Sequence, residues 1–218
     1  NNRIYGLTKG QYSPTSEVGK VTKSTPMGSL DHPFNPVSLA LGAEATFVAR
    51  TIDTDRNHLT GVLREAAAHR GTSLVEIYQN CPIFNDGAFD AIKDPETRDH
   101  AVIPLVHGQP VVYGPNGEHG LVRDPATGVI SAVEVTDANR DQLLVHDAHA
   151  DDPTLAFAIS RLTDGGHLDR APVGIFRQVE RATYDDRARQ QLQTAVESSG
   201  PGDLQQLLTG NDTWTVGA

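Results

Sequence analysis

Hydrophobic side chains recur at helical spacing in one long segment, residues 53–71. Five of them follow the spacing i, i+3, i+4, i+7 and i+8 and share one helix face: Leu59, Val62, Leu63, Ala66 and Ala67. Thr54 is available to cap the start of this helix, and Gly71 to end it. The flanking segments 45–52 and 72–79 have the β-branched and aromatic content of strands. Strand, helix and strand in this order predict a β-α-β unit of a parallel sheet.

The chain before this unit has little periodicity. Residues 1–31 are rich in Gly, Ser, Thr, Pro and Lys and are predicted to form loops, with at most a short helix. A short helix is predicted next, with Asn35 as N-cap, Pro36 at the first helical position and Gly42 at its end.

Beyond the unit, turn residues separate short apolar runs. Small β elements are predicted within residues 103–135. Residues 143–166 are predicted to form a strand, a loop and a helix from about Pro153. Two further surface helices are predicted, over residues 185–200 and 202–210.

The change of character after Phe89 predicts the domain organisation. Residues 1–89 are expected to form part of a core α/β domain, and residues 90–218 a C-terminal α+β extension that packs on the core and on a partner subunit. The predicted fold class is therefore α/β, with a parallel sheet, helices on both faces and this extension.

Composition narrows the function classes. The net charge is −10, with 28 Asp and Glu against 18 Lys and Arg, which argues against a nucleic-acid partner and fits docking to a partner with a basic patch. No stretch approaches the about 20 apolar residues of a membrane helix, so we expect no membrane span. The single cysteine excludes an internal disulfide and suits a reducing compartment, which predicts a cytoplasmic protein.

The start of the chain, NNRIYGLTKGQYSPTS, has no methionine, no basic n-region and no apolar h-region, so it is not a signal peptide. Asn-Asn followed by Arg is typical of the loop after a strand, with the strand itself missing. We therefore expect the chain to be the later part of a longer polypeptide.

The same segment has the residue types of a magnesium and phosphate site. The Asn2 amide oxygen and the Ile4 carbonyl are hard oxygen ligands of the kind Mg²⁺ prefers. Gly6 and Gly10 allow close backbone approach, and the N–H groups and hydroxyl of Gly-Leu-Thr can hold phosphate oxygens. On spacing alone an ordinary turn explains these residues better.

Cys81, in EIYQNCPIFND, follows the second predicted strand. Residue statistics alone favour a small apolar filler, because free cysteine is among the most buried residue types. Asn2 and Cys81 each lie just past the carboxyl end of an inferred or predicted strand. That edge is where open α/β sheets bind ligands, so we expect the two residues to face one crevice.

Taken whole, the segments around these residues resemble the β subunits of the 2-oxoacid:ferredoxin oxidoreductases, specifically those of the 2-oxoglutarate enzymes. The thiamine-diphosphate motif of that family begins Gly-Asp-Gly and ends in Asn-x-(Ile/Val)-Tyr-Gly-(Leu/Met)-Thr. Its second half is present here as Asn2, Ile4, Tyr5, Gly6, Leu7 and Thr8. The resemblance covers the whole chain and is most specific in residues 1–16 and 74–87.

The resemblance implies a thiamine-diphosphate-binding fold of the pyrophosphate type, with its N-terminal part absent from this chain. It implies that Asn2, through its side chain, and Ile4, through its carbonyl, bind Mg²⁺. The residues implied to contact the cofactor are Tyr5, Gly6, Leu7 and Thr8. Leu7 is expected to lie near the 2-oxoacid, and no catalytic residue is assigned.

For Cys81 the resemblance implies the fourth ligand of a 4Fe–4S cluster, since the family carries it in a Cys-Pro-x-x-Asn context. Asn85 and Asp86 are then candidates to support the cluster, although a simple turn explains them equally well. The Gly-Asp-Gly half of the motif and the other three cluster cysteines are absent. By itself the chain can complete neither site, and we identify it as the C-terminal part of the β subunit.

The implied function is oxidative decarboxylation of 2-oxoglutarate with coenzyme A to succinyl-CoA and CO₂, with electrons passing from thiamine diphosphate through the cluster to ferredoxin. An α subunit is the expected partner, in an αβ or (αβ)₂ assembly. Three alternatives stay open: the same chemistry on pyruvate or another 2-oxoacid, a thiamine-diphosphate enzyme without a cluster, and a truncated, non-catalytic scaffold.

The segment VHDAHADD, residues 145–152, is a weaker metal candidate. His146 and His149 are spaced i, i+3 in a predicted loop, whereas a helical metal pair needs i, i+4. Asp152 before Pro153 is a common helix start, and no third ligand from another element is evident.

Overall fold

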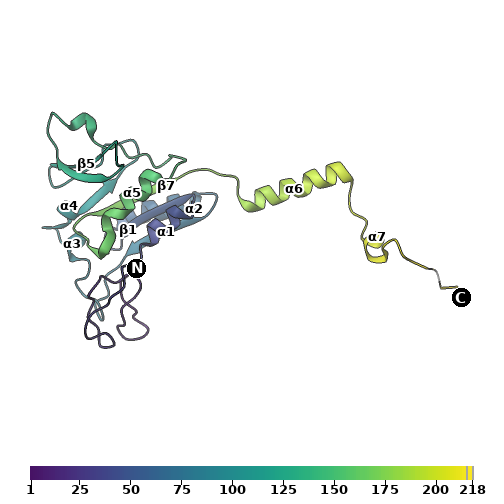
Figure 1. The fold of residues 1–218 in the computed structure, drawn as a ribbon, viewed down its shortest axis with the longest axis horizontal. Helices are drawn as coiled ribbons and strands as arrows, with labels where there is room; N and C mark the ends of the chain where they lie inside the picture. Colours follow the sequence, from purple (N-terminus) through teal and green to yellow (C-terminus); the bar gives the residue numbers. More distant parts are fainter. Residues whose placement is uncertain (215, 218) are drawn as a thin grey trace. The chain divides into compact units, whose positions relative to one another are not determined.

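The computed structural model describes residues 1–214 and 216–217 and divides into two compact units, Asn1–Glu180 and Arg181–Ala218 (Figure 1). The larger unit contains two sheets and most of the helices. Among the described residues, no helix combines the length and the apolar character needed to cross a bilayer.

The main sheet has four strands in the order β2-β1-β7-β3. Its strands are β1 (Phe47–Ile52), β2 (Ser73–Tyr78), β3 (Val102–Leu105) and β7 (Ala171–Gln178). The pairs β1–β2 and β3–β7 are parallel, while β7 runs antiparallel to β1. The sheet is thus mostly parallel but contains one antiparallel junction, which the predicted β-α-β rhythm did not indicate.

Helices cover both faces of this sheet, as expected. Helices α1 (Pro36–Gly42) and α5 (Thr154–Ser160) pack on the face that carries Val48 and Phe176. Helix α2 (Arg56–Ala68) packs on the opposite face through Val62. Burial of alternate strand residues against the two helical layers therefore builds the core of the larger unit.

A third apolar cluster closes the edge where β1 and β2 end. Ile52 and Tyr78, the last residues of these strands, pack with Phe89 and with the short helices α3 (Asp90–Lys93) and α4 (Arg98–Ala101). This cluster fixes the carboxyl edge of the parallel pair, which is the edge that carries the candidate site.

The second sheet is small and antiparallel. It consists of β4 (Val112–Tyr113), β5 (His119–Arg123) and β6 (Ile130–Glu134), in that order. Two 3₁₀ helices complete the larger unit: η1 (Arg140–Gln142), which follows β6, and η2 (Arg161–Gly166), which follows α5. The small β elements expected within residues 103–135 are confirmed.

The smaller unit consists of α6 (Tyr184–Ser199) and α7 (Leu204–Thr209). Thr183 and Asp203 cap these helices by accepting from the backbone N–H of Asp186 and Gln206. Neither helix has a buried residue among those described. Both were predicted from the sequence.

The predicted β1-α2-β2 unit is confirmed with its parallel register, Phe47 opposite Ser73 and Ile52 opposite Tyr78. The predicted cap of α2 is wrong by one position, because the side chain of Asp55, rather than Thr54, accepts from His58 N–H at 3.1 Å. By contrast, Asn35 caps α1 as predicted.

Beyond Phe89, one predicted strand is absent from the described residues and one observed strand was not predicted. The strand predicted at the start of residues 143–166 is absent from the described structure, where only isolated bridges such as Val122–Leu143 occur. The central strand β7 was not predicted. Because β3 and β7 complete the same sheet as β1 and β2, the larger unit continues past residue 89 to Glu180. A functional division at residue 89 stays a prediction.

Candidate functional site

The N-terminal turn, residues 1–11, begins beside the carboxyl end of β2. The Asn1 backbone nitrogen donates to the Ile77 carbonyl at 2.7 Å, and the Asn1 carbonyl accepts from Gln79 N–H at 3.1 Å. These two bonds on either side of Tyr78 are the pattern of a parallel bridge. The backbone therefore enters the turn in strand-like register with β2, at the edge where open α/β sheets bind ligands.

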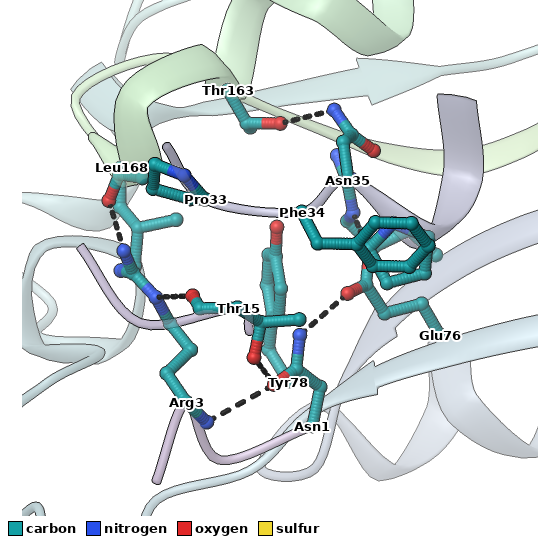
Figure 2. Close-up of a pocket in the computed structure, with 13 residues that line it drawn as sticks. Asn1, Arg3, Thr15, Pro33, Phe34, Asn35, Glu76, Tyr78, Thr163 and Leu168 are labelled. Atoms are coloured by element: carbon teal, nitrogen blue, oxygen red, sulfur yellow. Dashed lines mark hydrogen bonds and ion pairs between the residues drawn. The ribbon is translucent and has the colours of Figure 1, made fainter. Parts of the chain in front are cut away.

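A buried polar chain anchors the first residue of this turn to the sheet (Figure 2). Asn1 Nδ2 donates to Glu76 Oε1 at 2.7 Å, while Glu76 Oε2 accepts from Arg50 Nε at 2.8 Å. Arg50 is 1% exposed and Glu76 6%, so this ion pair lies in the core. Asn1 Oδ1 in turn accepts from Arg3 N–H at 3.0 Å and from Thr15 Oγ1 at 2.8 Å. The side chain of Asn1 thereby fixes the backbone of the turn.

The pocket that these residues line has a volume of only about 20 Å³, room for one water molecule rather than a cofactor. The Tyr78 ring borders it, within 5.0 Å of the Arg50 guanidinium carbon. Burial raises the pKa of Tyr78 to about 12, with the Arg50 charge opposing that rise. The pocket is thus a small polar cavity beneath the turn.

The second half of the turn folds back on itself. Tyr5 N–H donates to the Gln11 carbonyl at 2.8 Å, and Gly10 N–H donates to the Tyr5 carbonyl at 3.0 Å. Gly10 has a φ of +95°, and a Cβ there would lie 3.1 Å from Phe84 Cδ1. The backbone conformation therefore favours a glycine here, and a larger residue would also press on Phe84 in the loop that starts at Cys81.

The residues predicted to contact a cofactor lie on the outside of this fold. The Leu7 side chain is 99% exposed, and Tyr5 is half exposed. Gly6 accepts from Lys9 N–H at 3.0 Å, and the Thr8 hydroxyl lies at the limit of hydrogen bonding, 3.5 Å from the Tyr5 carbonyl. These side chains and N–H groups remain accessible to a ligand outside the protein core.

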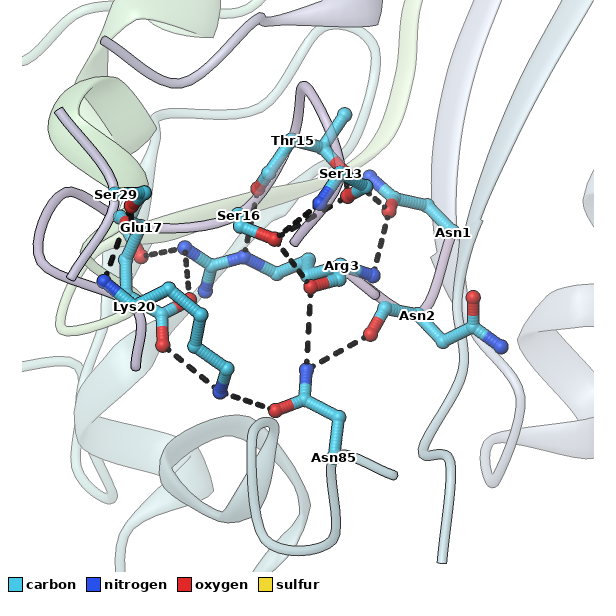
Figure 3. A network of polar contacts seen from close by, with 11 residues as sticks. Asn1, Asn2, Arg3, Ser13, Thr15, Ser16, Glu17, Lys20, Ser29 and Asn85 are labelled. Atoms are coloured by element: carbon cyan, nitrogen blue, oxygen red, sulfur yellow. Dashed lines mark hydrogen bonds and ion pairs between the residues drawn. The ribbon is translucent and has the colours of Figure 1, made fainter. Parts of the chain in front are cut away.

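Asn2 and Ile4, the predicted magnesium ligands, fit hard-cation binding. The Asn2 side chain points away from the polar network beside it (Figure 3) and makes no hydrogen bond to the described residues. The Ile4 side chain is buried, and no hydrogen bond within the described chain engages its carbonyl. Two oxygens near each other in sequence are thus left for a ligand such as Mg²⁺.

Cys81 opens the Cys81 loop, residues 81–86, directly after β2. Its side chain is a free, half-buried thiol. Its backbone carbonyl accepts a hydrogen bond from Asn85 N–H at 2.9 Å. This thiol could serve as one of the ligands of an iron–sulfur cluster, and the other thiolates would have to come from residues outside this chain. Within residues 1–214 and 216–217, no group of three or more His, Cys, Asp and Glu side chains is arranged to hold a metal.

Asn85 joins the Cys81 loop to the N-terminal turn, a link that the sequence did not indicate (Figure 3). Asn85 Nδ2 donates to the Asn2 carbonyl at 2.9 Å and points to the Arg3 carbonyl at 3.4 Å. Its Oδ1 accepts from Lys20 Nζ. The turn that carries Asn2 and the Cys81 loop are therefore in contact, while the expectation that Asn2 and Cys81 face one crevice stays a prediction. Asp86, the other supporting candidate, instead accepts from Asn80 Nδ2 at 2.7 Å.

Glu17 holds the cations of this network. Lys20 Nζ lies 3.1 Å from Glu17 Oε1, and Arg3 Nη2 lies 3.5 Å from Glu17 Oε2. Burial raises the pKa of Glu17, but its backbone and Lys20 hydrogen bonds and the Arg3 charge outweigh burial and keep it below the usual value. Glu17 therefore stays ionised and balances the two cations beside the turn.

The histidines of residues 145–152 are bound to β7. His146 Nε2–H donates to the Ile175 carbonyl and His149 Nδ1–H to the Gln178 carbonyl, each at 2.7 Å. Asp152 accepts from Thr154 N–H at 2.8 Å, at the start of α5. These contacts give the segment a structural role, holding the loop before α5 against the central sheet.

Comparison with known proteins gives the site a family context. Residues 1–77 match the thiamine pyrophosphate enzyme family, C-terminal TPP binding domain. The chain is 61% identical over 99% of its length to the 2-oxoglutarate oxidoreductase subunit KorB of Mycobacterium tuberculosis, and covers 57% of that protein. It is 30% identical over 94% of its length to the 2-oxoacid:ferredoxin oxidoreductase subunit beta of Saccharolobus solfataricus, and covers 55% of it.

A solved structure shares the fold. The 2-oxoglutarate:ferredoxin oxidoreductase from Magnetococcus marinus, with 2-oxoglutarate, coenzyme A and succinyl-CoA bound, aligns with a TM-score of 0.63 at 23% sequence identity. The alignment covers 97% of this chain and 56% of that one. The chain thus spans a little over half the length of each of these relatives.

Proposed function

Because the chain belongs to the family of 2-oxoacid:ferredoxin oxidoreductase β subunits, we propose that it forms part of an enzyme that oxidatively decarboxylates 2-oxoglutarate with coenzyme A. The products are succinyl-CoA and CO₂, and ferredoxin accepts the electrons. The observation that carries the proposal is the Asn85 bridge, which joins the proposed magnesium turn to the proposed cluster loop.

The N-terminal turn holds the first cofactor. Asn2 Oδ1 and the Ile4 carbonyl are the proposed Mg²⁺ ligands, in keeping with their lack of other partners within the described chain. The residues proposed to contact thiamine diphosphate are Tyr5, Gly6, Leu7 and Thr8. When bound, thiamine diphosphate supplies the electron sink for decarboxylation, and the protein supplies binding and orientation.

Cys81 is the proposed ligand to a 4Fe–4S cluster. It lies three residues beyond the end of β2, in the loop that Asn85 joins to the N-terminal turn, and this proximity favours electron transfer between the two cofactors. The other thiolates must come from outside the residues of this chain, since Cys81 is its only cysteine.

Leu7 is the residue proposed to shape the substrate pocket. Its side chain is almost fully exposed, so a substrate or a partner subunit can cover it. An α subunit is the proposed partner, in an αβ or (αβ)₂ assembly that completes the site. Residues 1–89 would then serve cofactor binding, and residues 90–218 would pack on the core and on the partner. We assign the protein to the cytoplasm, in keeping with its single cysteine.

The substrate proposal rests on the name of the relative with 61% identity, a 2-oxoglutarate oxidoreductase subunit. The same chemistry on pyruvate or a branched 2-oxoacid is the second candidate, because the relative with 30% identity is named only for 2-oxoacids. No basic residue that would pair with the distal carboxylate of 2-oxoglutarate is assigned in this chain.

The test is substrate-driven reduction of ferredoxin by the intact complex with its α subunit. We expect reduction that requires coenzyme A and is faster with 2-oxoglutarate than with pyruvate or 2-oxoisovalerate. Equal or faster reduction with pyruvate would reassign the substrate. Absence of reduction with every 2-oxoacid, in a complex that carries no thiamine diphosphate, would favour the scaffold instead.

A further inference from the structure

Among the described residues, Asn85 is the only residue of the Cys81 loop whose side chain hydrogen-bonds to the N-terminal turn. Its side chain is 4% exposed, so water does not compete for its hydrogen bonds. Its own backbone N–H donates to the Cys81 carbonyl at 2.9 Å. One residue thus contacts both segments that the proposed cofactors need.

The chemistry of the contact requires an amide. Asn85 Nδ2 donates to the carbonyls of Asn2 and Arg3, which only accept, while Asn85 Oδ1 accepts from the Lys20 ammonium, which only donates. A carboxylate could satisfy Lys20 but not the two carbonyls. An apolar side chain would leave the Asn2 carbonyl without a donor among the described residues, which is costly, whereas the Arg3 carbonyl would keep its bond from Ser16 Oγ at 2.6 Å.

The geometry also leaves the proposed magnesium ligands in place. The carbonyls that Asn85 engages belong to Asn2 and Arg3, whereas the proposed ligand atoms are the Asn2 side-chain oxygen and the Ile4 carbonyl. By fixing the peptide groups on either side, Asn85 holds these ligand atoms without using them. Phe84 of the Cys81 loop also lies beside Gly10 of the turn, where an added Cβ would come within 3.1 Å of Phe84 Cδ1.

We propose that Asn85 is a positioning residue that locks the N-terminal turn to the Cys81 loop, and thereby fixes the thiamine-diphosphate site relative to the iron–sulfur cluster. This inference rests on the proposed function. Its consequence is that the turn is preorganised for Mg²⁺ and thiamine diphosphate, and that loss of the lock weakens cofactor binding without removing the cluster.

The test compares Asn85→Asp with Asn139→Asp in the holoenzyme with its α subunit. Asn139 Nδ2 likewise donates to a backbone carbonyl, that of Glu134 at 2.9 Å, but in the turn after β6. Three readouts are needed: the Kd for thiamine diphosphate in excess Mg²⁺, hydrogen exchange of residues 1–12, and the rate of cluster reduction by 2-oxoacid. Iron content and thermal stability are measured beside them.

For Asn85→Asp we expect a Kd about tenfold higher and cluster reduction about tenfold slower, with faster exchange in residues 1–12 and unchanged iron content. Asn139→Asp should match the wild type in all three readouts. Lys20→Met provides a milder variant if Asn85→Asp does not assemble. It removes the bond to Asn85 Oδ1 together with the Lys20–Glu17 ion pair but keeps the Asn85 amide and its bond to the Asn2 carbonyl, and we expect a Kd about threefold higher.

Several outcomes would overturn the inference. A Kd and an exchange rate in Asn85→Asp equal to those of Asn139→Asp would remove the positioning role while leaving the proposed function intact. A fall in thermal stability and iron content with an unchanged Kd would reduce Asn85 to a structural residue. A wild-type holoenzyme that contains neither thiamine diphosphate nor iron would overturn the proposed function and this inference together.

Discussion

Asn1 Nδ2 donates to Glu76 Oε1 at 2.7 Å, which ties the first residue of the N-terminal turn to a charge buried in the central sheet. Glu76 can lie there because Arg50 Nε donates to its other oxygen at 2.8 Å. The Arg50 guanidinium is held further by the Pro172 carbonyl at 3.3 Å and by the Tyr78 and Phe176 rings. The first residue of the turn is therefore tied to an ion pair buried in the sheet.

Replacing Glu76 by glutamine should strongly destabilise the protein. The change leaves the Arg50 charge buried without its counter-ion, and breaking such a pair costs about 3–5 kcal/mol. Urea unfolding of Glu76→Gln, compared with Glu96→Gln at an exposed position, measures the cost. A loss no larger than that of Glu96→Gln would mean that the ion pair does not support the fold.

Replacing Gly10 by alanine should cost more than the same change at Gly19. Both residues have positive φ, +95° and +81°, so each alanine meets a backbone cost of about 1–2 kcal/mol. Only at Gly10 would the new Cβ press on a side chain, that of Phe84, and we expect about 1 kcal/mol more there. Equal free energies of unfolding for the two variants would show that Phe84 does not pack on the turn.

Stability should fall as the pH is lowered from about 7.5 to about 5.5. Burial lowers the pKa of His146 more strongly than its bond to the Ile175 carbonyl and the nearby Asp147 raise it, and His107 and His149 lower it further. The unfolded chain therefore takes up a proton at a pH where the folded protein does not.

The contribution of His146 to the free energy of unfolding is fully present above the unfolded-state pKa of about 6.5 and is lost as the pH falls below it. Burial lowers the pKa of His58 as well, so both residues act in the same direction. Unfolding free energies of His146→Gln across this range should show a shallower slope than the wild type, since the amide can still donate to the Ile175 carbonyl. An unchanged slope would contradict the assignment.

Serine at Cys81 should remove cluster iron from the intact complex. A serine oxygen is a poor substitute for a soft thiolate ligand, so we expect the content to fall well below the about four irons of a 4Fe–4S cluster. Ile83→Ala, at an exposed site of the same loop, is the matched control. Full iron content in Cys81→Ser would leave Cys81 as a simple packing residue.

Local patterns predicted the local parts of the fold. The β1-α2-β2 unit has helical periodicity between two β-rich segments, and Asn35 and Pro36 have the chemistry of a helix start. These elements depend on residues close in sequence. The expectation that Asn2 and Cys81 face one crevice also came from their positions after strands, and it stays a prediction.

The central strand β7 could not be predicted in this way. It contains Pro172 and Gly174, which weaken strand propensity, and the buried Arg177, whose Nη1 donates to the Glu44 and Ala45 carbonyls. Its strand conformation depends on pairing with β1 and β3, which are far away in sequence. Pairing with β1 and β3 therefore stabilises the strand conformation of β7, although its local sequence does not favour a strand.

The residues that support the candidate site form contacts with residues far away in sequence, so local patterns could not predict these contacts. The contact of Glu76 with Arg50 spans 26 residues, and that of Asn85 with Lys20 spans 65. Nothing local distinguishes a charged strand residue that is buried from one that faces solvent. Sequence motifs indicated the residues proposed to touch cofactors and named Asn85 as a candidate to support the cluster. The contacts of Asn85 with the turn and with Lys20 emerged only from the structure.

The most direct test of the account is calorimetric titration of the intact complex, depleted of cofactor, with thiamine diphosphate in excess Mg²⁺. We predict saturable binding in the wild type and in Ile4→Val, which keeps the proposed carbonyl ligand. In Asn2→Ala, which removes an oxygen without breaking a hydrogen bond to the described residues, we predict a Kd at least about tenfold higher. Wild-type binding that is absent, or that is equally tight in Asn2→Ala, would contradict the claim that this turn holds the cofactor.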